Sequence, residues 1–119
     1  MMRYAVIGGS SFIGVYVVDE LLSRGVEVVA TGRNPRFADH YRKRGVPYVA
    51  VDICDRASFD ALANWEFDGA VSLAARMPAN IEKDPQTEDI ADYIETNVAG
   101  TANILEWCRA RGVNRLVDI

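Results

Sequence analysis

Residues 6–14 read VIGGSSFIG, and this stretch decides the fold. An apolar, strand-like run ends in two glycines, and Gly14 follows after two serines and two apolar residues. A strand that turns through glycines into a helix is typical of a dinucleotide-binding loop, because glycines permit the tight turn and the close approach of the backbone to a pyrophosphate. The first N–H groups of the helix then face the phosphates. The alternative is a tight turn that binds nothing.

Ser11 is the departure from this pattern, because it stands where the middle glycine is expected. Its Cβ adds bulk where the backbone should come closest to phosphate, whereas its hydroxyl adds a hydrogen-bond donor. Either the pyrophosphate shifts and accepts a bond from that hydroxyl, or the cofactor binds weakly. A third interpretation is that Ser10 and Ser11 only cap the following helix, a role that suits serine.

The rest of the chain alternates between two kinds of segment. Apolar, β-branched runs predict strands at 3–8, 26–31, 47–53, 69–75 and 115–119. The segments between them have helical spacing, and they predict four helices. The first helix ends before Gly25, and one stripe of it holds Phe12, Val15, Val18 and Leu22. The second covers 36–44. The third begins after Asp55 and turns Phe59, Leu62 and Ala63 inward. The fourth runs from about Thr87 to Ala110, and close to one of its faces lie Ile90, Ile94, Val98, Leu105 and Cys108.

Continuous apolar strands separated by helices predict an α/β fold with a parallel sheet buried on both faces. We expect a doubly wound Rossmann sheet with strand order 3-2-1-4-5, in which the last predicted strand ends the chain. Ligands of such sheets bind at the carboxyl ends of the strands, where the order reverses. The glycine loop lies at that point.

Composition narrows the class of protein. The 119 residues are 50% hydrophobic and 25% charged, which indicates a single soluble globular domain over 1–119. A net charge of −4 argues against nucleic-acid binding, and no apolar stretch approaches the roughly 18 residues of a membrane span. We expect a cytoplasmic protein, since no cleavage site follows the first apolar run. With one histidine, His40, and two distant cysteines, Cys54 and Cys108, we expect no metal site and two reduced, buried thiols.

The end of the second strand bears on the choice of cofactor. An NAD-selective site would place an acid there for the ribose 2′-hydroxyl, but the position reads Gly32. Residues 33–44 carry five basic side chains against one acid. A basic cluster beside the ribose favours a 2′-phosphate, and hence NADP over NAD, the alternative being a solvated helix face. From the two loops we expect cofactor contacts at Gly8, Gly9, Ser10, Ser11, Phe12, Ile13 and Gly14, and at Gly32, Arg33, Asn34 and Arg36.

Four segments together resemble a known family. They are VIGGSSFIG (6–14), AVDICD (50–55), DGAVSLAA (68–75) and NVAGTANILEWCRARGVNRLV (97–117). In this order and spacing they resemble the extended short-chain dehydrogenase/reductases, the NAD-dependent epimerase/dehydratase family. The resemblance implies that Asp52 and Ile53 contact the adenine, and that Leu73, Ala74 and Ala75 line the nicotinamide side. It implies that Asn97 fixes the active-site end of the long helix. The alternatives are a helix or turn cap for Asp52 and a surface amide for Asn97.

The resemblance also implies the chemistry: a sugar-nucleotide epimerase or dehydratase, or a related reductase, that transfers hydride between the cofactor and a small-molecule carbinol or carbonyl. The family's catalytic Tyr-x-x-x-Lys is absent, because no tyrosine here precedes a lysine by four positions. We therefore expect an N-terminal part of a longer enzyme, with catalytic residues beyond Ile119. The alternative is a non-catalytic NADP(H)-binding redox sensor.

Two further expectations concern partners. Arg76 and Asn80, in the loop after the fourth strand, are candidate substrate contacts, although a solvated loop explains them as well. An open edge on the fifth strand predicts a homo-oligomer.

Overall fold

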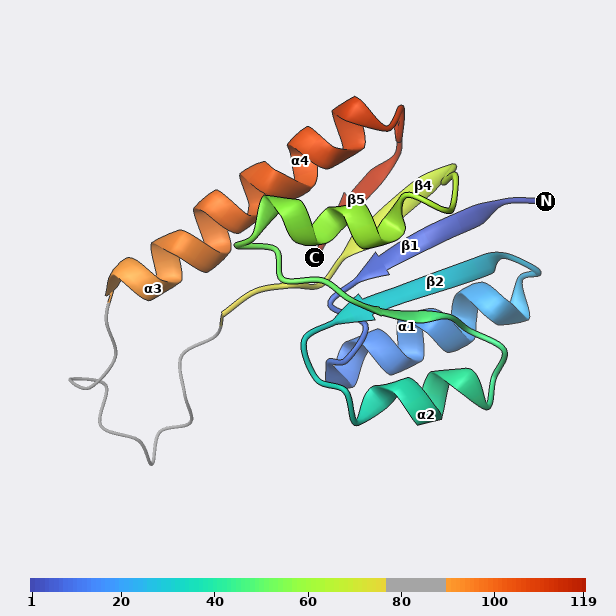
Figure 1. Ribbon diagram of the computed structural model, residues 1–119. Coiled ribbons are helices and arrows are strands. Elements are labelled where there is room, and N and C mark those ends of the chain that lie inside the picture. The colour runs from blue at the N-terminus through green and yellow to red at the C-terminus, as the bar shows by residue number, and fades with distance from the viewer. Residues whose placement is uncertain (77–89) are drawn as a thin grey trace.

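The computed structural model describes residues 1–76 and 90–119. Its elements alternate along the chain as predicted (Figure 1). The strands are β1 (Arg3–Ile7), β2 (Glu27–Gly32), β3 (Tyr48–Ala50), β4 (Gly69–Ser72) and β5 (Leu116–Asp118). The helices are α1 (Phe12–Ser23), α2 (Phe37–Arg42), the 3₁₀ helix η1 (Arg56–Leu62), α3 (Ile90–Ile94), the π-helical segment η3 (Glu95–Ala99) and α4 (Gly100–Ala110).

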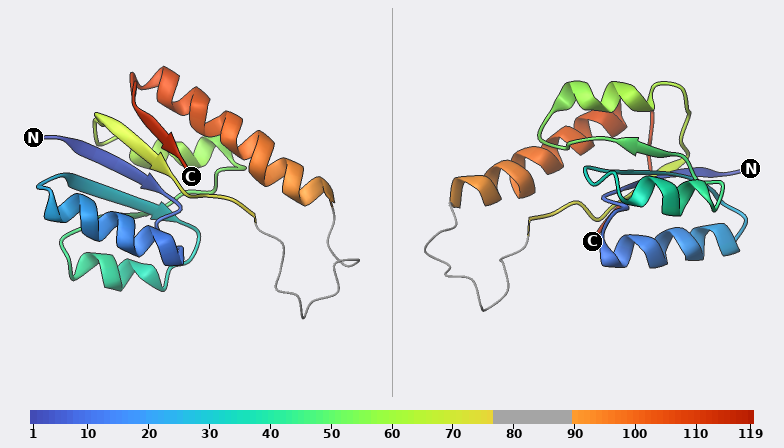
Figure 2. Two further views of the ribbon diagram at one scale, coloured as in Figure 1. Left: turned by 180° about the vertical axis from the view of Figure 1, so that it is seen from behind. Right: turned by 60° about the horizontal axis from the view of Figure 1, so that its bottom comes forward.

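The described strands form one parallel sheet in the order β3-β2-β1-β4-β5, which confirms the predicted topology. Figure 2 shows α1 and α2 on one face of the sheet, and η1 with the α3–α4 helix on the other. Successive residues of β1 point to opposite faces. Val6 therefore packs with Val18 of α1 and Tyr41 of α2, whereas Ala5 and Ile7 belong to the core under η1 and α4.

The helices differ from the prediction in which residues they bury. Phe12 begins α1 but is 80% exposed, while Val18 is buried. In η1, Phe59 and Leu62 are buried as expected, but Ala63 is exposed because it follows the last residue of a 3₁₀ turn rather than an α-helical one. Asp55 caps η1 by accepting a hydrogen bond from the Ala57 N–H at 3.1 Å.

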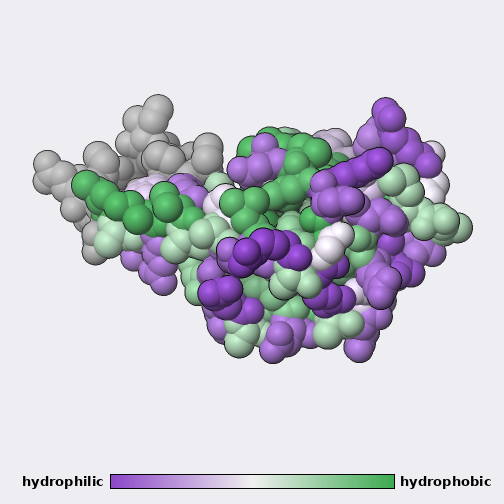
Figure 3. Space-filling view, turned by 90° about the horizontal axis from the view of Figure 1, so that it is seen from above, coloured by the Kyte–Doolittle hydropathy of each residue, from purple (hydrophilic) through white to green (hydrophobic). Residues whose placement is uncertain are grey.

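The fourth predicted helix consists of α3, η3 and α4 in direct succession, and its expected start at Thr87 lies outside the described residues. Its buried residues are Gly100, Ile104, Trp107 and Cys108. Except at Cys108, the residues predicted to share one face are exposed rather than packed on the sheet: Ile90, Ile94, Val98 and Leu105. Figure 3 shows hydrophobic surface over the α3 end of this helix. The side chains that pack on the sheet lie on another side of α4.

Among the described residues, no helix is long and apolar enough to cross a membrane. The same residues contain no group of three or more acidic, histidine or cysteine side chains placed to hold a metal ion.

Candidate dinucleotide site

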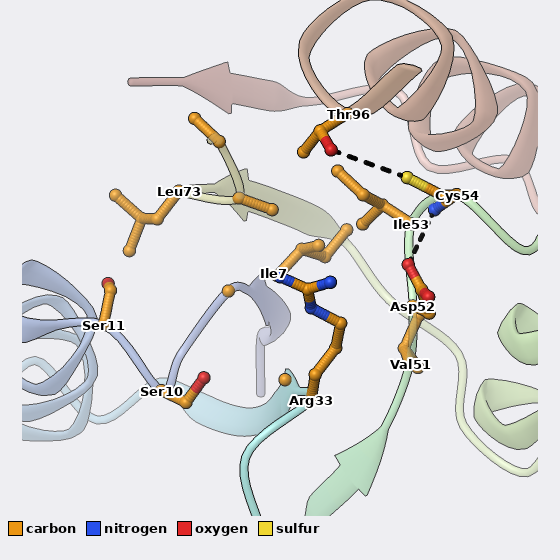
Figure 4. Close-up of a pocket in the computed structure, with 14 residues that line it drawn as sticks. Ile7, Ser10, Ser11, Arg33, Val51, Asp52, Ile53, Cys54, Leu73 and Thr96 are labelled. Carbon is orange, nitrogen blue, oxygen red and sulfur yellow. Dashed lines mark hydrogen bonds between the residues drawn. The ribbon is translucent and has the colours of Figure 1, made fainter. Parts of the chain in front are cut away.

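A cavity of about 160 Å³ opens at the carboxyl edge of the sheet, where the order of the strands reverses (Figure 4). It is lined by the ends of four strands and the loops that follow them, together with one residue of the long helix. The lining residues are Ile7, Gly8, Ser10, Ser11, Gly32, Arg33, Val51, Asp52, Ile53, Cys54, Leu73, Ala74, Ala75 and Thr96. Because its volume is well below the roughly 300 Å³ of an enclosing ligand pocket, a dinucleotide would lie along the open edge.

The glycines of the first loop are required by its geometry. Gly8 has φ +85°, and a Cβ there would lie 2.8 Å from the backbone nitrogen of Ala74. A Cβ at Gly14 would lie 2.7 Å from the carbonyl oxygen of Gly9. The loop therefore touches the end of β4 on one side and helix α1 on the other. A side chain at either position would force the backbone apart, which agrees with a loop built for close backbone approach.

Ser11 caps helix α1. Its Oγ accepts a hydrogen bond from the Gly14 N–H at 2.9 Å, and its φ of −89° strains no side chain. Ser11 therefore does cap the helix, whereas Ser10 makes no capping bond in the described residues, and phosphate binding by Ser11 stays a prediction. The Ser11 hydroxyl accepts this bond through its oxygen and keeps its own hydrogen for a further acceptor. Capping and phosphate binding are therefore compatible at this residue.

At Gly32, the last residue of β2, two side chains from other segments fill the space where a ribose-binding acid is expected. A Cβ at Gly32 would collide with the Tyr48 hydroxyl and would lie 2.5 Å from Ser10 Oγ. The Tyr48 hydroxyl donates to the Asn34 carbonyl at 2.8 Å, which holds it there. These two hydroxyls occupy the space that an acidic side chain at position 32 would need. An acidic side chain at position 32 would therefore clash with its neighbours.

The basic cluster of residues 33–44 divides between the two ends of α2, so the prediction of a single cluster beside the ribose is wrong. Arg33 is exposed, lines the cavity and directs its side chain across it (Figure 4). Arg42 pairs with Asp39 at 3.0 Å, and Arg44 pairs with Asp19 of α1. Neither Arg42 nor Arg44 lines the cavity, since both stand at the C-terminal end of α2.

Asp52 and Ile53 also have structural roles. The Asp52 carboxylate accepts from the Cys54 N–H at 3.0 Å, so it caps the turn while lining the cavity. Ile53 lies against Gly100, where a Cβ would come within 2.6 Å of its Cδ1. This contact is the packing reason for a glycine within the long helix.

Asn97 joins the long helix to the end of β4. Its Oδ1 accepts from the Arg76 N–H at 2.7 Å, and its Nδ2 donates to the Arg76 carbonyl at 3.0 Å. The residue belongs to η3, and π-helical segments are frequent at functional sites. Asn97 is an exposed amide that is held by two hydrogen bonds, and its role at an active site stays a prediction. Arg76 itself lies 3.7 Å from Asp92 and over the Tyr93 ring, and the second candidate, Asn80, lies outside the described residues.

Comparison with known proteins agrees with this geometry. A family model described as the NAD dependent epimerase/dehydratase family matches residues 4–119. The chain belongs to this family.

Individual relatives show how broad the family is. The chain is 30% identical over 127 residues to a dTDP-glucose 4,6-dehydratase of Neisseria meningitidis, an alignment that covers 92% of this chain and 32% of the relative. It is 32% identical over 120 residues to a 2-alkyl-3-oxoalkanoate reductase of Stenotrophomonas maltophilia, with 98% and 32% covered. A crystal structure of UDP-glucose 4-epimerase from Thermus thermophilus with NAD superposes with a TM-score of 0.79 at 33% identity, covering 97% of this chain and 36% of that one. The chain thus spans about a third of the length of these relatives.

Ten of the residues predicted to contact the cofactor line the cavity. Seven of the predicted residues do not line it: Gly9, which is buried within the loop, and Phe12, Ile13, Gly14, Asn34, Arg36 and Asn97. Arg36 is the cap position of α2, where its N–H donates to Asn34 Oδ1 at 3.0 Å. The cofactor contacts of all these residues stay predictions.

Sequence reasoning missed four lining residues, which are Ile7, Val51, Cys54 and Thr96. Cys54 is half-buried rather than buried, and its Sγ lies 3.8 Å from Thr96 Oγ1. Their positions next to Ile53 and Asn97 in sequence were the available signal. Cys108 is buried as expected, and burial raises the pKa of its thiol.

Proposed function

We propose that this chain is the dinucleotide-binding part of an NAD(P)-dependent enzyme of the epimerase/dehydratase family. One observation carries the proposal: the ends of four parallel strands meet in one cavity around a glycine loop that leaves no room for side chains at Gly8 and Gly14. A glycine loop at the carboxyl edge of the sheet, followed by the N-terminus of α1, suits a pyrophosphate. The solved relative from Thermus thermophilus was crystallised with NAD, which supports the same class of cofactor here.

The chemistry that a bound nicotinamide supplies is the acceptance and return of a hydride. The residues of this chain would orient the cofactor: Ser11 and the first turn of α1 at the phosphates, Asp52 and Ile53 at the adenine, and the small side chains of Ala74 and Ala75 under the nicotinamide. The substrate proposed is a small carbinol or carbonyl compound, with nucleotide sugars favoured by the names of two relatives. The sequence holds no tyrosine four residues before a lysine, and we propose that the chain alone binds cofactor without turnover.

We further propose that NADP is preferred to NAD. Gly32 offers no carboxylate to a ribose 2′-hydroxyl, and the neighbouring space is taken by the hydroxyls of Tyr48 and Ser10. Arg33 is the cation beside this position, and a guanidinium binds phosphate through two parallel hydrogen bonds. A 2′-phosphate therefore gains contacts here that a 2′-hydroxyl does not.

Isothermal titration of NADP⁺ and NAD⁺ tests both statements. We expect Arg33→Ala to weaken NADP⁺ binding by roughly 10-fold to 100-fold, the range of a hydrogen bond to a charged group, and to leave NAD⁺ within about twofold. Arg42→Ala is the matched control, because Arg42 pairs with Asp39 at the far end of α2. If neither nucleotide binds below millimolar concentration, the dinucleotide site is refuted. If NAD⁺ binds more tightly and Arg33→Ala changes nothing, only the NADP preference is refuted.

Association with a second copy is also proposed. Among the described residues, β5 pairs with β4 alone, and Val117 and Ile119 on it or next to it are more than half exposed. An unpaired strand edge is a template for another chain. Sedimentation velocity over a range of concentrations should show dimers or larger species, and a strictly monomeric chain would contradict the proposal.

A further inference from the structure

Behind the glycine loop, two stacked tyrosines connect the first two loops of the site. The rings of Tyr41 and Tyr48 lie 5.8 Å apart with an 18° angle between their planes. Tyr41, the next-to-last residue of α2, is fully buried, and its hydroxyl donates a hydrogen bond to the Gly9 carbonyl. The Tyr48 hydroxyl donates to the Asn34 carbonyl in the second loop. Each ring thus holds one carbonyl of the two loops that meet at the cavity.

The bond from Tyr41 fixes the orientation of one peptide group. No cis peptide bond occurs in the described residues, so the Gly9–Ser10 peptide is trans. In a trans peptide the C=O and the N–H point in opposite directions. Since the Gly9 carbonyl points back to Tyr41, the Ser10 N–H points away from Tyr41, on the side where Ser10 lines the cavity.

Two further contacts support this arrangement. The Gly9 N–H donates to the Thr31 carbonyl at 2.7 Å, so the residue is held at both of its backbone polar groups. The Ser10 N–H, by contrast, has no protein acceptor in the described part of the chain. A hydrogen bond to one end of a peptide group polarises it and strengthens the donor at the other end. Tyr41 is therefore placed to orient a free backbone donor and to strengthen it.

We propose that Tyr41 is a positioning residue of the pyrophosphate site, which turns the Ser10 N–H toward the bound phosphates from behind the loop. The inference rests on the proposed dinucleotide site and adds to it a residue that touches no cofactor atom. A phenylalanine at position 41 would keep the stacked ring and lose the bond. The peptide would then be free to rotate, and the Ser10 donor would lose its fixed direction.

The first experiment separates this role from general destabilisation. We would measure dissociation constants of NADP⁺ and of adenosine 2′-monophosphate, which lacks the pyrophosphate and the nicotinamide riboside, and take their ratio as the joint contribution of those two groups. Tyr41→Phe should lower that contribution by about 5-fold to 10-fold, the range of one hydrogen bond, with the monophosphate constant changed less than twofold. Tyr48→Phe, the matched control one ring away, should leave the ratio unchanged. An unchanged ratio in Tyr41→Phe would overturn the proposal.

The second experiment needs no variant and no dinucleotide. Sodium pyrophosphate titrated into the ¹⁵N-labelled chain should shift the Ser10 amide more than any other amide of the loop. If the Ser10 amide resonance does not shift, the inference is overturned, even where Tyr41→Phe fails to fold. If Ser10 shifts with pyrophosphate and shifts less in Tyr41→Phe, but neither NADP⁺ nor NAD⁺ binds, the positioning role stands and the proposed dinucleotide function falls.

Discussion

The two sides of the sheet's carboxyl edge are held in different ways. Around β1 to β3, side chains reach across from one loop to another: Tyr41 holds Gly9, Tyr48 holds Asn34, and Gly8 touches the end of β4. Along the α3–α4 helix, the apolar side chains of Ile90, Ile94 and Val98 face outward with no such partners in the described residues. Contacts between loops hold the first region in place, whereas the second region exposes apolar side chains to solvent. Substitutions should therefore lower the free energy of unfolding strongly in the first region, and only slightly at the outward-facing positions of the helix.

The largest effect is expected from Gly8→Ala. The residue has a positive φ, and its new Cβ would meet the Ala74 backbone. Gly25→Ala is the control, because Gly25 also has a positive φ but has open space around its Cβ. We expect Gly25→Ala to lower the free energy of unfolding by about 1–2 kcal/mol, and Gly8→Ala by at least about 3 kcal/mol with loss of NADP⁺ binding. Urea denaturation measures the free energy of unfolding of both variants. An equal loss in the two would show that the contact between Gly8 and the Ala74 backbone does not stabilise the loop.

The next effect is a pH dependence in the first region. Burial, and secondly the neighbouring Tyr48, raise the pKa of Tyr41 to about 12, from about 10 in the unfolded chain. The unfolded chain thus loses this proton first, and the contribution of Tyr41 is complete below pH 10 and falls as the pH rises to 12. The free energy of unfolding should fall by up to about 1.4 kcal/mol per pH unit in this window. Denaturation of Tyr41→Phe, which lacks this proton, should show a shallower decline; parallel curves would refute the assignment.

The smallest effect is expected on the long helix. Ile94→Ala removes a side chain that is 56% exposed, and it should change the free energy of unfolding by less than about 0.5 kcal/mol. Ile104→Ala, on the same helix but at 1% exposure, should cost about 2–5 kcal/mol because it opens a cavity in the core. Thermal denaturation of the two variants gives the comparison. A large cost at Ile94 would show that this face is covered in solution.

The sequence predicted what depends on local pattern. The strand order follows from the alternation of strands and helices, and the turn at Gly8 follows from the glycines. The Tyr41–Gly9 bond joins residues 32 positions apart and has no local signature, so it was not predicted. Arg42 and Arg44 were misplaced because charge counting ignores the direction in which α2 runs. Ile94 was misplaced because helical spacing shows which residues share a face but not what covers that face.

The π-helical turn at Glu95–Ala99 has a consequence for any change of chain length in the long helix. Such a turn holds one residue more than an α-helical turn of the same rise, so the extra residue is contained within the wide turn. Deleting one residue from this segment would restore a regular helix and leave α3 facing much as it does now. The change would be confined to the turn, where Asn97 would leave the Arg76 backbone. Chain length in this turn, more than the identity of any side chain, sets the position of Asn97 opposite Arg76.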